Sequence, residues 1–286
     1  MKIAMLGVEN SHADEFGKLI VEKPEKYGDI EVVGIYSEDE EATKRLIDKG
    51  YATCAAKTPD EFLGKVDAVI VVARHGDNHY KYAMPYVKAG IPCFIDKPFC
   101  ANLDNAKELA ETAKANGALL CGGSCVKFLD EIKHLTRLAN EKRVVGGMVA
   151  TPINIDNPYG GFWFYTQHLV EMMTTIFGRK VKSVIANCPD EKLRRVTVIF
   201  KYDDFDVCGI YSPSNKFYAN VMFENSTLEQ GYCDNVLYTF ERELDMFVDM
   251  VKNGVMIESY DELVYPVKVL DAIHRSYIEK KEIVIE

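Results

Sequence analysis

An apolar run in the first half of the chain ends in a carboxylate and a lysine that could bind an oxygen-containing ligand. Residues 91–95 read Ile-Pro-Cys-Phe-Ile and lead into Asp96-Lys97-Pro98. Pro98 restricts Lys97 to extended backbone and ends the strand, and open α/β sheets bind ligands at the carboxyl ends of their strands. An ammonium group fixed there beside a carboxylate can orient a hydroxyl or carbonyl oxygen. Taken alone, the tripeptide is equally compatible with a solvated turn.

A second group of candidate residues follows the first strand, in Gly7-Val-Glu-Asn-Ser-His12. A dinucleotide-binding fold carries Gly-x-Gly-x-x-Gly at this point, and here only Gly7 is present, with Glu9 and His12 at the other two positions. A carboxylate beside a pyrophosphate adds like-charge repulsion. Asn10 and Ser11, however, are good N-caps, and a helix N-terminus offers N–H groups to an anion. The pattern predicts that this turn lines a nucleotide site through the side chain or backbone of five residues: Gly7, Glu9, Asn10, Ser11 and His12.

Polar residues also follow the second and third strands. Ser37 stands where an acidic residue would bind the ribose hydroxyls, and the adjacent Glu38 could replace that acid. No arginine follows immediately to favour a 2′-phosphate, so both NAD and NADP stay open as the cofactor. Arg74 and His75 come directly after a strand, and we expect them to face either the ligand or the solvent.

The elements that must position these residues alternate between strand and helix over the first ~120 residues. Apolar strands alternating with amphipathic helices indicate a parallel sheet covered on both faces. The expected strands are Ile3–Leu6, Ile30–Tyr36, Ala68–Val72, Cys93–Ile95 and Ala118–Cys121, and the expected helices are Ala13–Val21, Glu40–Lys49, Pro59–Leu63, His79–Ala89 and Leu103–Asn116.

After Gly122-Gly123 the pattern changes to helices and a run of alternating strands. This predicts an α/β chain of two domains: residues 1–120, a doubly wound parallel sheet, and residues 121–286, an α+β domain with an open, mostly antiparallel sheet. The helices expected in the second domain are Glu131–Asn140, Gly160–Phe177, Leu237–Lys252 and Asp261–Lys280, and the strands are Val181–Asn187, Arg195–Tyr202, Phe205–Tyr211, Phe217–Phe223 and Ile283–Ile285.

Composition excludes several classes of partner. The 286 residues are 48% hydrophobic and 27% charged, with a formal net charge of -10. This balance is typical of a globular protein and argues against nucleic acid or an anionic membrane as a partner. No stretch is apolar enough for a signal peptide or a membrane span, so a cytoplasmic location is expected. Cys121 and Cys125 lack a second ligand pair at zinc-like spacing, and we expect no metal site.

Three segments, in order, resemble one family. They are a strand and loop ending in a histidine (66–79), the Asp96-Lys97-Pro98 turn, and a histidine-bearing helix (159–171). With the closing helix around 247–255 and the last strand around 281–285, the chain resembles the glucose–fructose oxidoreductase/inositol dehydrogenase/rhizopine-catabolism (Gfo/Idh/MocA) family over nearly its whole length. The resemblance implies a Rossmann domain, NAD or NADP as cofactor, and a homodimer or homotetramer formed through the second-domain sheet.

The resemblance also implies an activity and the residues that perform it. The activity is hydride transfer to or from a secondary hydroxyl or carbonyl of a sugar, cyclitol or related molecule. Lys97 would lie near the nicotinamide and the reacting oxygen with Asp96 beside it, His168 would be the general acid/base, and His79 would line the pocket. This suits the chemistry, because an imidazole can take the hydroxyl proton near neutral pH and a lysine can stabilise alkoxide charge.

One departure from the family concerns the proton relay. Many members carry an aspartate one helical turn before the histidine, where this chain has Phe164. Tyr165 and Glu171, three residues from His168 on either side, could provide the polar partner instead, and Tyr165 is taken as a catalytic candidate. Two other functions stay open: an enzyme that retains NAD and catalyses no net redox reaction, such as a lyase or glycosidase, and a non-catalytic nucleotide- or sugar-binding protein.

Overall fold

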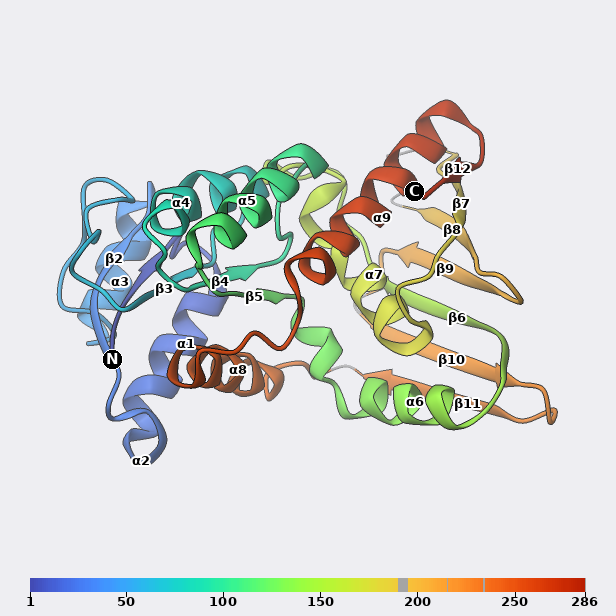
Figure 1. Cartoon of the computed structure of the whole chain (residues 1–286), viewed down its shortest axis with the longest axis horizontal. Helices are drawn as coiled ribbons and strands as arrows, with labels where there is room; N and C mark the ends of the chain where they lie inside the picture. The colour runs from blue at the N-terminus through green and yellow to red at the C-terminus, as the bar shows by residue number, and fades with distance from the viewer. Residues whose placement is uncertain (190–194, 215, 234, 286) are drawn as a thin grey trace. The chain divides into compact units, whose positions relative to one another are not determined.

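The computed structural model describes residues 1–189, 195–214, 216–233 and 235–285 (Figure 1). The chain forms two compact units. The first consists of Met1–Gly123 together with Phe240–Val264, and the second of Ser124–Thr239 together with Tyr265–Glu286. The first unit therefore takes up a segment from late in the sequence in addition to the N-terminal strands and helices.

The first unit is built on a five-stranded parallel sheet in the order β2-β1-β3-β4-β5. Its strands are short and almost entirely buried, because a parallel sheet is covered by helices on both faces. The order reverses at β1, so the crevice beyond the carboxyl ends of β1 and β3 is where such a fold binds its ligand. The strands are β1 (Lys2–Leu6), β2 (Glu31–Tyr36), β3 (Ala68–Val71), β4 (Cys93–Asp96) and β5 (Leu120–Gly123).

Helices cover both faces of this sheet. On one face α4 (Gly76–Lys88) and α5 (Leu103–Asn116) lie side by side, and on the other lie α1 (Ser11–Glu22) and α8 (Thr239–Asn253) (Figure 1). The short α2 (Pro24–Tyr27) follows α1, and α3 (Glu40–Asp48) connects β2 to β3. Phe94 of β4 packs edge-on against Phe247, with ring centroids 6.3 Å apart, so α8 contributes directly to the core of the first unit.

Charged contacts also join α8 to the N-terminal segment. Lys26 lies 3.0 Å from Glu241 and 2.7 Å from Asp245, and the Tyr27 hydroxyl donates to Asp245 at 2.7 Å. These side chains are partly exposed, so each ion pair contributes little alone. The apolar packing of α8 on the sheet contributes more, and the ion pairs fix its register against α2.

The second unit is built on a seven-stranded sheet in the order β11-β10-β6-β9-β8-β7-β12. Only β6 and β9 pair in parallel; the other neighbours are antiparallel. This mixed, mostly antiparallel sheet after a parallel one confirms the predicted fold class. The strands are β6 (Val144–Pro152), β7 (Ser183–Asn187), β8 (Val196–Lys201), β9 (Asp206–Ser212), β10 (Phe217–Phe223), β11 (Leu228–Cys233) and β12 (Ile283–Val284).

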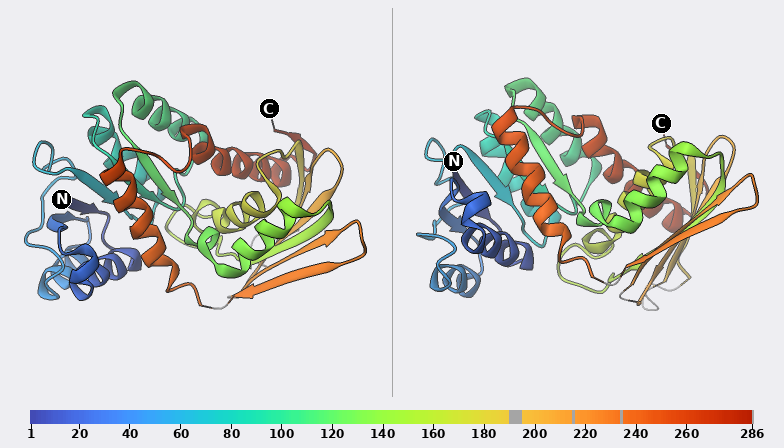
Figure 2. Two further views of the ribbon diagram at one scale, coloured as in Figure 1. Left: turned by 60° about the horizontal axis from the view of Figure 1, so that its bottom comes forward. Right: turned by 90° about the horizontal axis from the view of Figure 1, so that it is seen from below.

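Helices cover one face of this second sheet (Figure 2). They are the 3-10 helix η1 (Cys125–Phe128), α6 (Asp130–Glu141), α7 (Trp163–Phe177) and the later part of α9 (Tyr260–Glu279). The other face carries apolar side chains that remain exposed. Four of them, exposed by 40–53%, are Ile185, Met222, Leu228 and Tyr232.

Three local predictions were wrong or incomplete. Residues 59–63, expected as a helix, form turns. The strands β6 and β11 were not predicted, although β6 is an interior strand of the sheet, paired on both sides. The pair Gly146-Gly147 locally indicates a loop rather than a strand. In the structure a Cβ on Gly147 would lie 2.4 Å from the Phe177 ring, so glycine lets α7 approach β6 closely. Among the residues described, no helix is both long and apolar enough to span a bilayer.

Candidate active site

The turn after β1 requires glycine at position 7. Gly7 has φ +77°, and a Cβ there would lie 2.4 Å from Cβ of Ala73, which follows β3. Its N–H donates to the carbonyl of Tyr36 at the end of β2, at 2.7 Å. The backbone therefore turns tightly against the ends of both neighbouring strands and directs the chain into α1.

Glu9 reaches across the carboxyl edge of the sheet. Its carboxylate accepts a hydrogen bond from the Ser37 hydroxyl at 2.7 Å and another from the backbone N–H of Arg74 at 3.0 Å. The residue that departs from the glycine pattern thus contacts two further predicted site residues. Glu9, Ser37 and Arg74 form one cluster at the ends of β2 and β3.

The N-terminus of α1 is capped by Asn10, whose Oδ1 accepts from the N–H of His12 at 3.5 Å. Ser11, the first residue of the helix, is exposed. The amide nitrogen of Asn10 donates to Asp96 Oδ2 at 3.0 Å, and His12 Nδ1 lies 2.8 Å from the same oxygen. The structure therefore joins two of the predicted cofactor residues to the turn after β4.

Asp96 is fully buried and receives contacts on both oxygens. Besides Asn10 and His12 on Oδ2, the N–H of Lys97 donates to Oδ1 at 2.7 Å. Burial alone would raise the pKa of Asp96, but the neighbouring His12 and Lys97 hold it below its usual value. The carboxylate is thus ionised at neutral pH, and it fixes the backbone at the point where Lys97, itself 5% exposed, leaves the strand.

His12 is covered by an aromatic ring as well. It is 5% exposed, and its ring lies edge-on to that of Phe240 in α8, with centroids 4.6 Å apart. This packing and the contact with Asp96 make His12 a link between α1, β4 and α8. Its position at the third glycine of the expected pattern is consequently filled by a packed side chain.

His79 lies on α4 and is fully buried. Its ring nitrogens lie 2.6 Å from two carbonyl oxygens, Nδ1 from that of Pro98 and Nε2 from that of Ala73. Burial lowers the pKa of His79, whereas Asp96 and the two carbonyls act in the opposite direction. The ring connects the loop after β3 to the Asp96-Lys97-Pro98 turn.

The other residues predicted after β3 have local roles in the structure. His75 is the N-cap of α4, and its Nδ1 accepts from the N–H of Asp77 at 3.2 Å. Arg74 contributes the backbone N–H that Glu9 binds. Both side chains are partly exposed, so they lie at the surface of the sheet edge rather than in its core.

In the second unit, His168 lies on α7 and is 4% exposed. Its Nδ1 lies 2.6 Å from the hydroxyl oxygen of Ser124, which caps η1 and also accepts from the N–H of Val126 at 3.3 Å. The His168 ring lies edge-on to Tyr165, with centroids 4.6 Å apart. A hydroxyl thus contacts one imidazole nitrogen and fixes the ring orientation, as the partners of functional histidines do.

A buried carboxylate supports this arrangement. Glu171 is 3% exposed, and its Oε1 accepts from the Gln167 side chain at 2.9 Å and from the N–H of Ser124 at 3.4 Å. Of the two partners suggested for His168, Tyr165 contacts the ring face-to-edge, whereas Glu171 reaches it through Ser124. Phe164, where the resemblance led us to expect an aspartate, packs against Tyr159 with ring centroids 5.1 Å apart.

Sequence reasoning did not identify Ser124 or Gln167. Ser124 is separated from His168 by 44 residues, and its only signal was its place after two glycines at the end of β5. Gln167 directly precedes the histidine. Its hydrogen bond to Glu171 follows from their spacing of four residues only once residues 163–177 are known to be helical, with both side chains buried.

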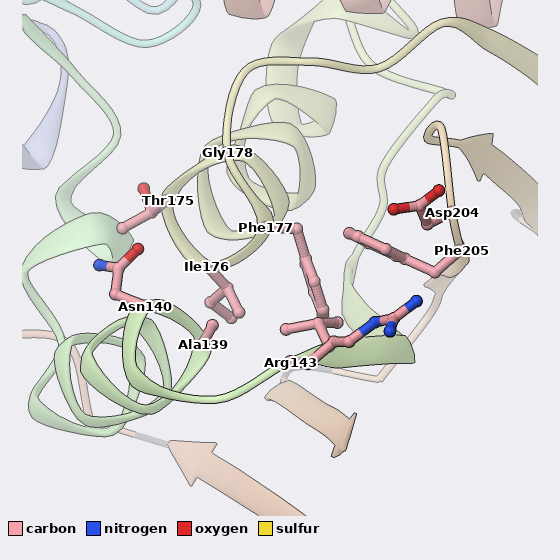
Figure 3. Close-up of a pocket in the computed structure, with 10 residues that line it drawn as sticks. Ala139, Asn140, Arg143, Thr175, Ile176, Phe177, Gly178, Asp204 and Phe205 are labelled. Carbon is pink, nitrogen blue, oxygen red and sulfur yellow. The ribbon is translucent and has the colours of Figure 1, made fainter. Parts of the chain in front are cut away.

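A cavity of about 320 Å³ also opens in the second unit, at the C-terminal end of α7 (Figure 3). It contains none of the predicted site residues, since His168 lies in the first half of that helix. Its lining includes Asn140 and Thr175 on one side, and on the other Arg143 below the rings of Phe177 and Phe205, whose centroids are 6.1 Å apart (Figure 3). This cavity is separate from the candidate site.

The first unit fits a dinucleotide. The glycine turn, the capped start of α1 and the reversal of strand order at β1 are the features by which this fold binds a pyrophosphate. Glu9 does not contradict this, because its carboxylate is bound by Ser37 and Arg74 at the ends of β2 and β3. These elements define a Rossmann-type dinucleotide-binding protein with an appended α+β unit.

Comparison with known proteins agrees with this class. Residues 1–123 match the GFO_IDH_MocA family, described as an oxidoreductase family with an NAD-binding Rossmann fold. The matched residues lie in the first unit, which is an NAD-binding domain similar to those of the Gfo/Idh/MocA family. An uncharacterized oxidoreductase of Escherichia coli K12, YhhX, is 29% identical over 133 residues, which span 42% of this chain and 38% of that protein.

Solved structures resemble the whole chain. GenD2 from gentamicin A biosynthesis, in complex with NAD, aligns with a TM-score of 0.86 and 17% identity over 100% of this chain and 96% of its own. Myo-inositol 2-dehydrogenase from Lactobacillus plantarum aligns with a TM-score of 0.85 and 14% identity, over 100% and 99%. At these identities the likeness establishes the fold of both units.

Proposed function

We propose that this protein is an NAD(P)-dependent oxidoreductase that transfers a hydride to or from a secondary hydroxyl or carbonyl of a sugar, cyclitol or related molecule. The observation that carries the proposal is the turn at the end of β4. There a fully buried, ionised Asp96 fixes the backbone of Lys97 at the ligand-binding edge of an NAD-binding sheet. A lysine fixed in this way is poorly explained as a solvated turn, because its side chain is 5% exposed.

The residues around β1 would bind the cofactor. Gly7 leaves room for the tight turn, and the N-terminus of α1, at Asn10 and Ser11, would receive the pyrophosphate. When bound, the nicotinamide supplies the hydride acceptor or donor. The contacts of Asn10 and His12 with Asp96 connect the phosphate-binding turn rigidly to the Lys97 turn.

Lys97 would act on the reacting oxygen. Its ammonium group stabilises the negative charge that develops on that oxygen as the hydroxyl loses its proton. The fixed backbone matters, because a donor aimed before reaction need not reorganise during it. His79 would act as a positioning residue, since its ring bridges the carbonyls of Ala73 and Pro98 on either side of this edge.

His168 would transfer the proton. A general base must keep one imidazole nitrogen available for the hydroxyl proton while the other is oriented by a partner. Ser124 provides that partner at Nδ1, and it can accept from an Nδ1–H so that Nε2 carries the lone pair. Tyr165, whose ring packs against the imidazole, would help to hold its orientation and border the substrate.

The aromatic residues near His168 favour a polyhydroxylated substrate. Aromatic rings that can stack on a sugar ring gather at the start of α7, including Tyr159, Phe164 and Tyr165. The structural relative from Lactobacillus plantarum is described as a myo-inositol dehydrogenase, which agrees with this substrate class.

We also propose that the exposed face of the seven-stranded sheet forms a homo-oligomer contact. Ile185, Met222, Leu228 and Tyr232 leave apolar surface in water on the face without helices, and such a patch is typical of an interface. Met222→Lys with Tyr232→Glu should convert a dimer or tetramer into a monomer in light scattering after gel filtration. Val255→Lys, at an exposed apolar site of the first unit, is the control. A wild-type monomer would contradict this proposal.

Turnover assays test the proposed reaction. With a panel of sugars and cyclitols, the wild type should change NADH absorbance, and Lys97→Met and His168→Gln should each reduce kcat at least about 100-fold. Lys107→Met and His134→Gln, at exposed positions on α5 and α6, are matched controls that should retain activity. Product formed without any change in NADH would favour the enzyme with no net redox. Unchanged turnover in both site variants would refute the mechanism.

A further inference from the structure

The carboxylate of Glu9 occupies an unusual place for a residue of the phosphate-binding turn. It lies 2.7 Å from the hydroxyl of Ser37, the residue that follows β2. In this fold a carboxylate at the end of β2 binds the ribose hydroxyls of the cofactor. Here the residue at that position is a serine, and the carboxylate next to it comes from the β1 turn.

The position of this carboxylate is fixed by two donors on different strands. Oε2 accepts from Ser37 at the end of β2, and Oε1 accepts from the N–H of Arg74 after β3. Each carboxylate oxygen can accept further hydrogen bonds. Glu9 is half-buried rather than enclosed, so these remaining acceptor positions can be reached from the sheet edge.

We propose that Glu9 replaces the acidic residue missing at the end of β2: it receives the ribose hydroxyls of the cofactor and makes the site select NAD over NADP. This inference rests on the proposed nucleotide site but not on the reaction performed there. Ser37 acts with it as a positioning residue, since its hydroxyl holds the carboxylate at β2.

Charge explains the selectivity. The 2′,3′-diol of NAD can donate hydrogen bonds to a carboxylate, whereas the 2′-phosphate of NADP brings at least one further negative charge to the same point. Two basic side chains near this point already pair with a carboxylate: Arg45 of α3 and Lys49, its C-cap, lie 3.0 and 2.7 Å from Asp14 of α1. Glu38, the alternative acid, is exposed and lies 3.5 Å from Lys81 on α4.

Calorimetric titration of the full chain with NAD and with NADP tests the proposal without any turnover measurement. The wild type should bind NAD at least about 30-fold more tightly than NADP. In Glu9→Gln the shape is retained and the charge is lost, so the ratio should fall to within about 3-fold. The matched control is Glu38→Gln, which removes an exposed carboxylate one residue beyond Ser37 and should leave the ratio unchanged.

A measurement on the unmodified chain keeps the test decisive if Glu9→Gln does not fold. Adenosine 5′-monophosphate should displace bound NAD at lower concentration than adenosine 2′,5′-bisphosphate, by about 10-fold or more. Equal displacement, or a wild type that prefers NADP, would overturn the inference, as would an unchanged ratio in Glu9→Gln. These results would leave the proposed oxidoreductase standing. A chain that binds neither dinucleotide would overturn both.

Discussion

The hydroxyl oxygen of Ser124 lies 2.6 Å from Nδ1 of His168, so a serine partners the helix histidine in this chain. The aspartate that the family resemblance led us to expect on the preceding turn is absent, since Phe164 stands there. A hydroxyl carries no charge, but it can accept from Nδ1–H and so select the tautomer with a lone pair on Nε2. Glu171 supports Ser124 by accepting its backbone N–H at 3.4 Å.

Replacing Ser124 should impair catalysis more than binding. In Ser124→Ala the imidazole loses the oxygen that orients it, and kcat should fall about 10- to 100-fold with a small change in KM. Ser124→Thr retains a hydroxyl and should restore much of the rate, whereas Ser214→Ala, at an exposed serine of the same unit, should have no effect. Steady-state kinetics of the three variants would contradict this role if the alanine and threonine variants behaved alike.

Replacing Gly7 should destabilise the first unit through a steric clash. An alanine there would place its Cβ 2.4 Å from Cβ of Ala73 at φ +77°, and unfolding free energy should fall by about 3 kcal/mol or more. Gly50 is a close control, because it has φ +72° and nothing within 4 Å of the added Cβ. Gly50→Ala should cost only about 1 kcal/mol. Equal losses in urea unfolding would show that packing against Ala73 is unimportant.

The edge of the first sheet was largely predictable from the sequence. Gly7, Asp96 and Lys97 follow apolar runs, and the ends of parallel strands must meet at one edge. The sequence could not indicate in which direction the side chains after each strand point or which groups they contact. Glu9 read as an obstacle to a pyrophosphate, and only the structure shows its carboxylate at Ser37 and the N–H of Arg74.

The second unit was harder to predict because its pairing is non-local. The interior strand β6 contains Gly146-Gly147 and ends in Pro152, and these residues locally indicate a loop. Gly147 is explained by Phe177, 30 residues later, whose ring occupies the space that a side chain at position 147 would take. Ser124 was missed for the same reason: its contact with His168 joins residues that lie 44 positions apart in the sequence.

Replacing His79 should mainly affect stability. Both ring nitrogens lie 2.6 Å from carbonyl oxygens, of Ala73 and Pro98, inside a fully buried site. His79→Ala leaves two buried carbonyls and a cavity, so unfolding free energy should fall by about 3 kcal/mol or more. His134→Ala, at an exposed position on α6, should change it by less than about 0.5 kcal/mol. Activity lost with unchanged stability would instead indicate direct contact with the ligand.

Replacing Asp96 should destabilise the chain in a pH-dependent way. Its two oxygens receive Asn10, His12 and the N–H of Lys97 in a fully buried site, so Asp96→Asn should cost about 3 kcal/mol at pH 7. Burial raises the pKa of Asp96, but its charged neighbours outweigh that effect and hold the pKa below the ordinary value of 3.8.

A lowered folded-state pKa means that the carboxylate stabilises the fold above its unfolded pKa, and that this contribution is lost as pH falls through the folded pKa. The difference in unfolding free energy between wild type and Asp96→Asn should therefore be constant from pH 7 to about 5 and shrink below about pH 4. Asp48→Asn, at an exposed carboxylate of α3, is the control and should stay within about 0.5 kcal/mol of wild type. Urea unfolding at pH 7, 5 and 3 measures both differences. If the Asp96→Asn difference were as large at pH 3 as at pH 7, the carboxylate's charge would not be what fixes the Lys97 turn.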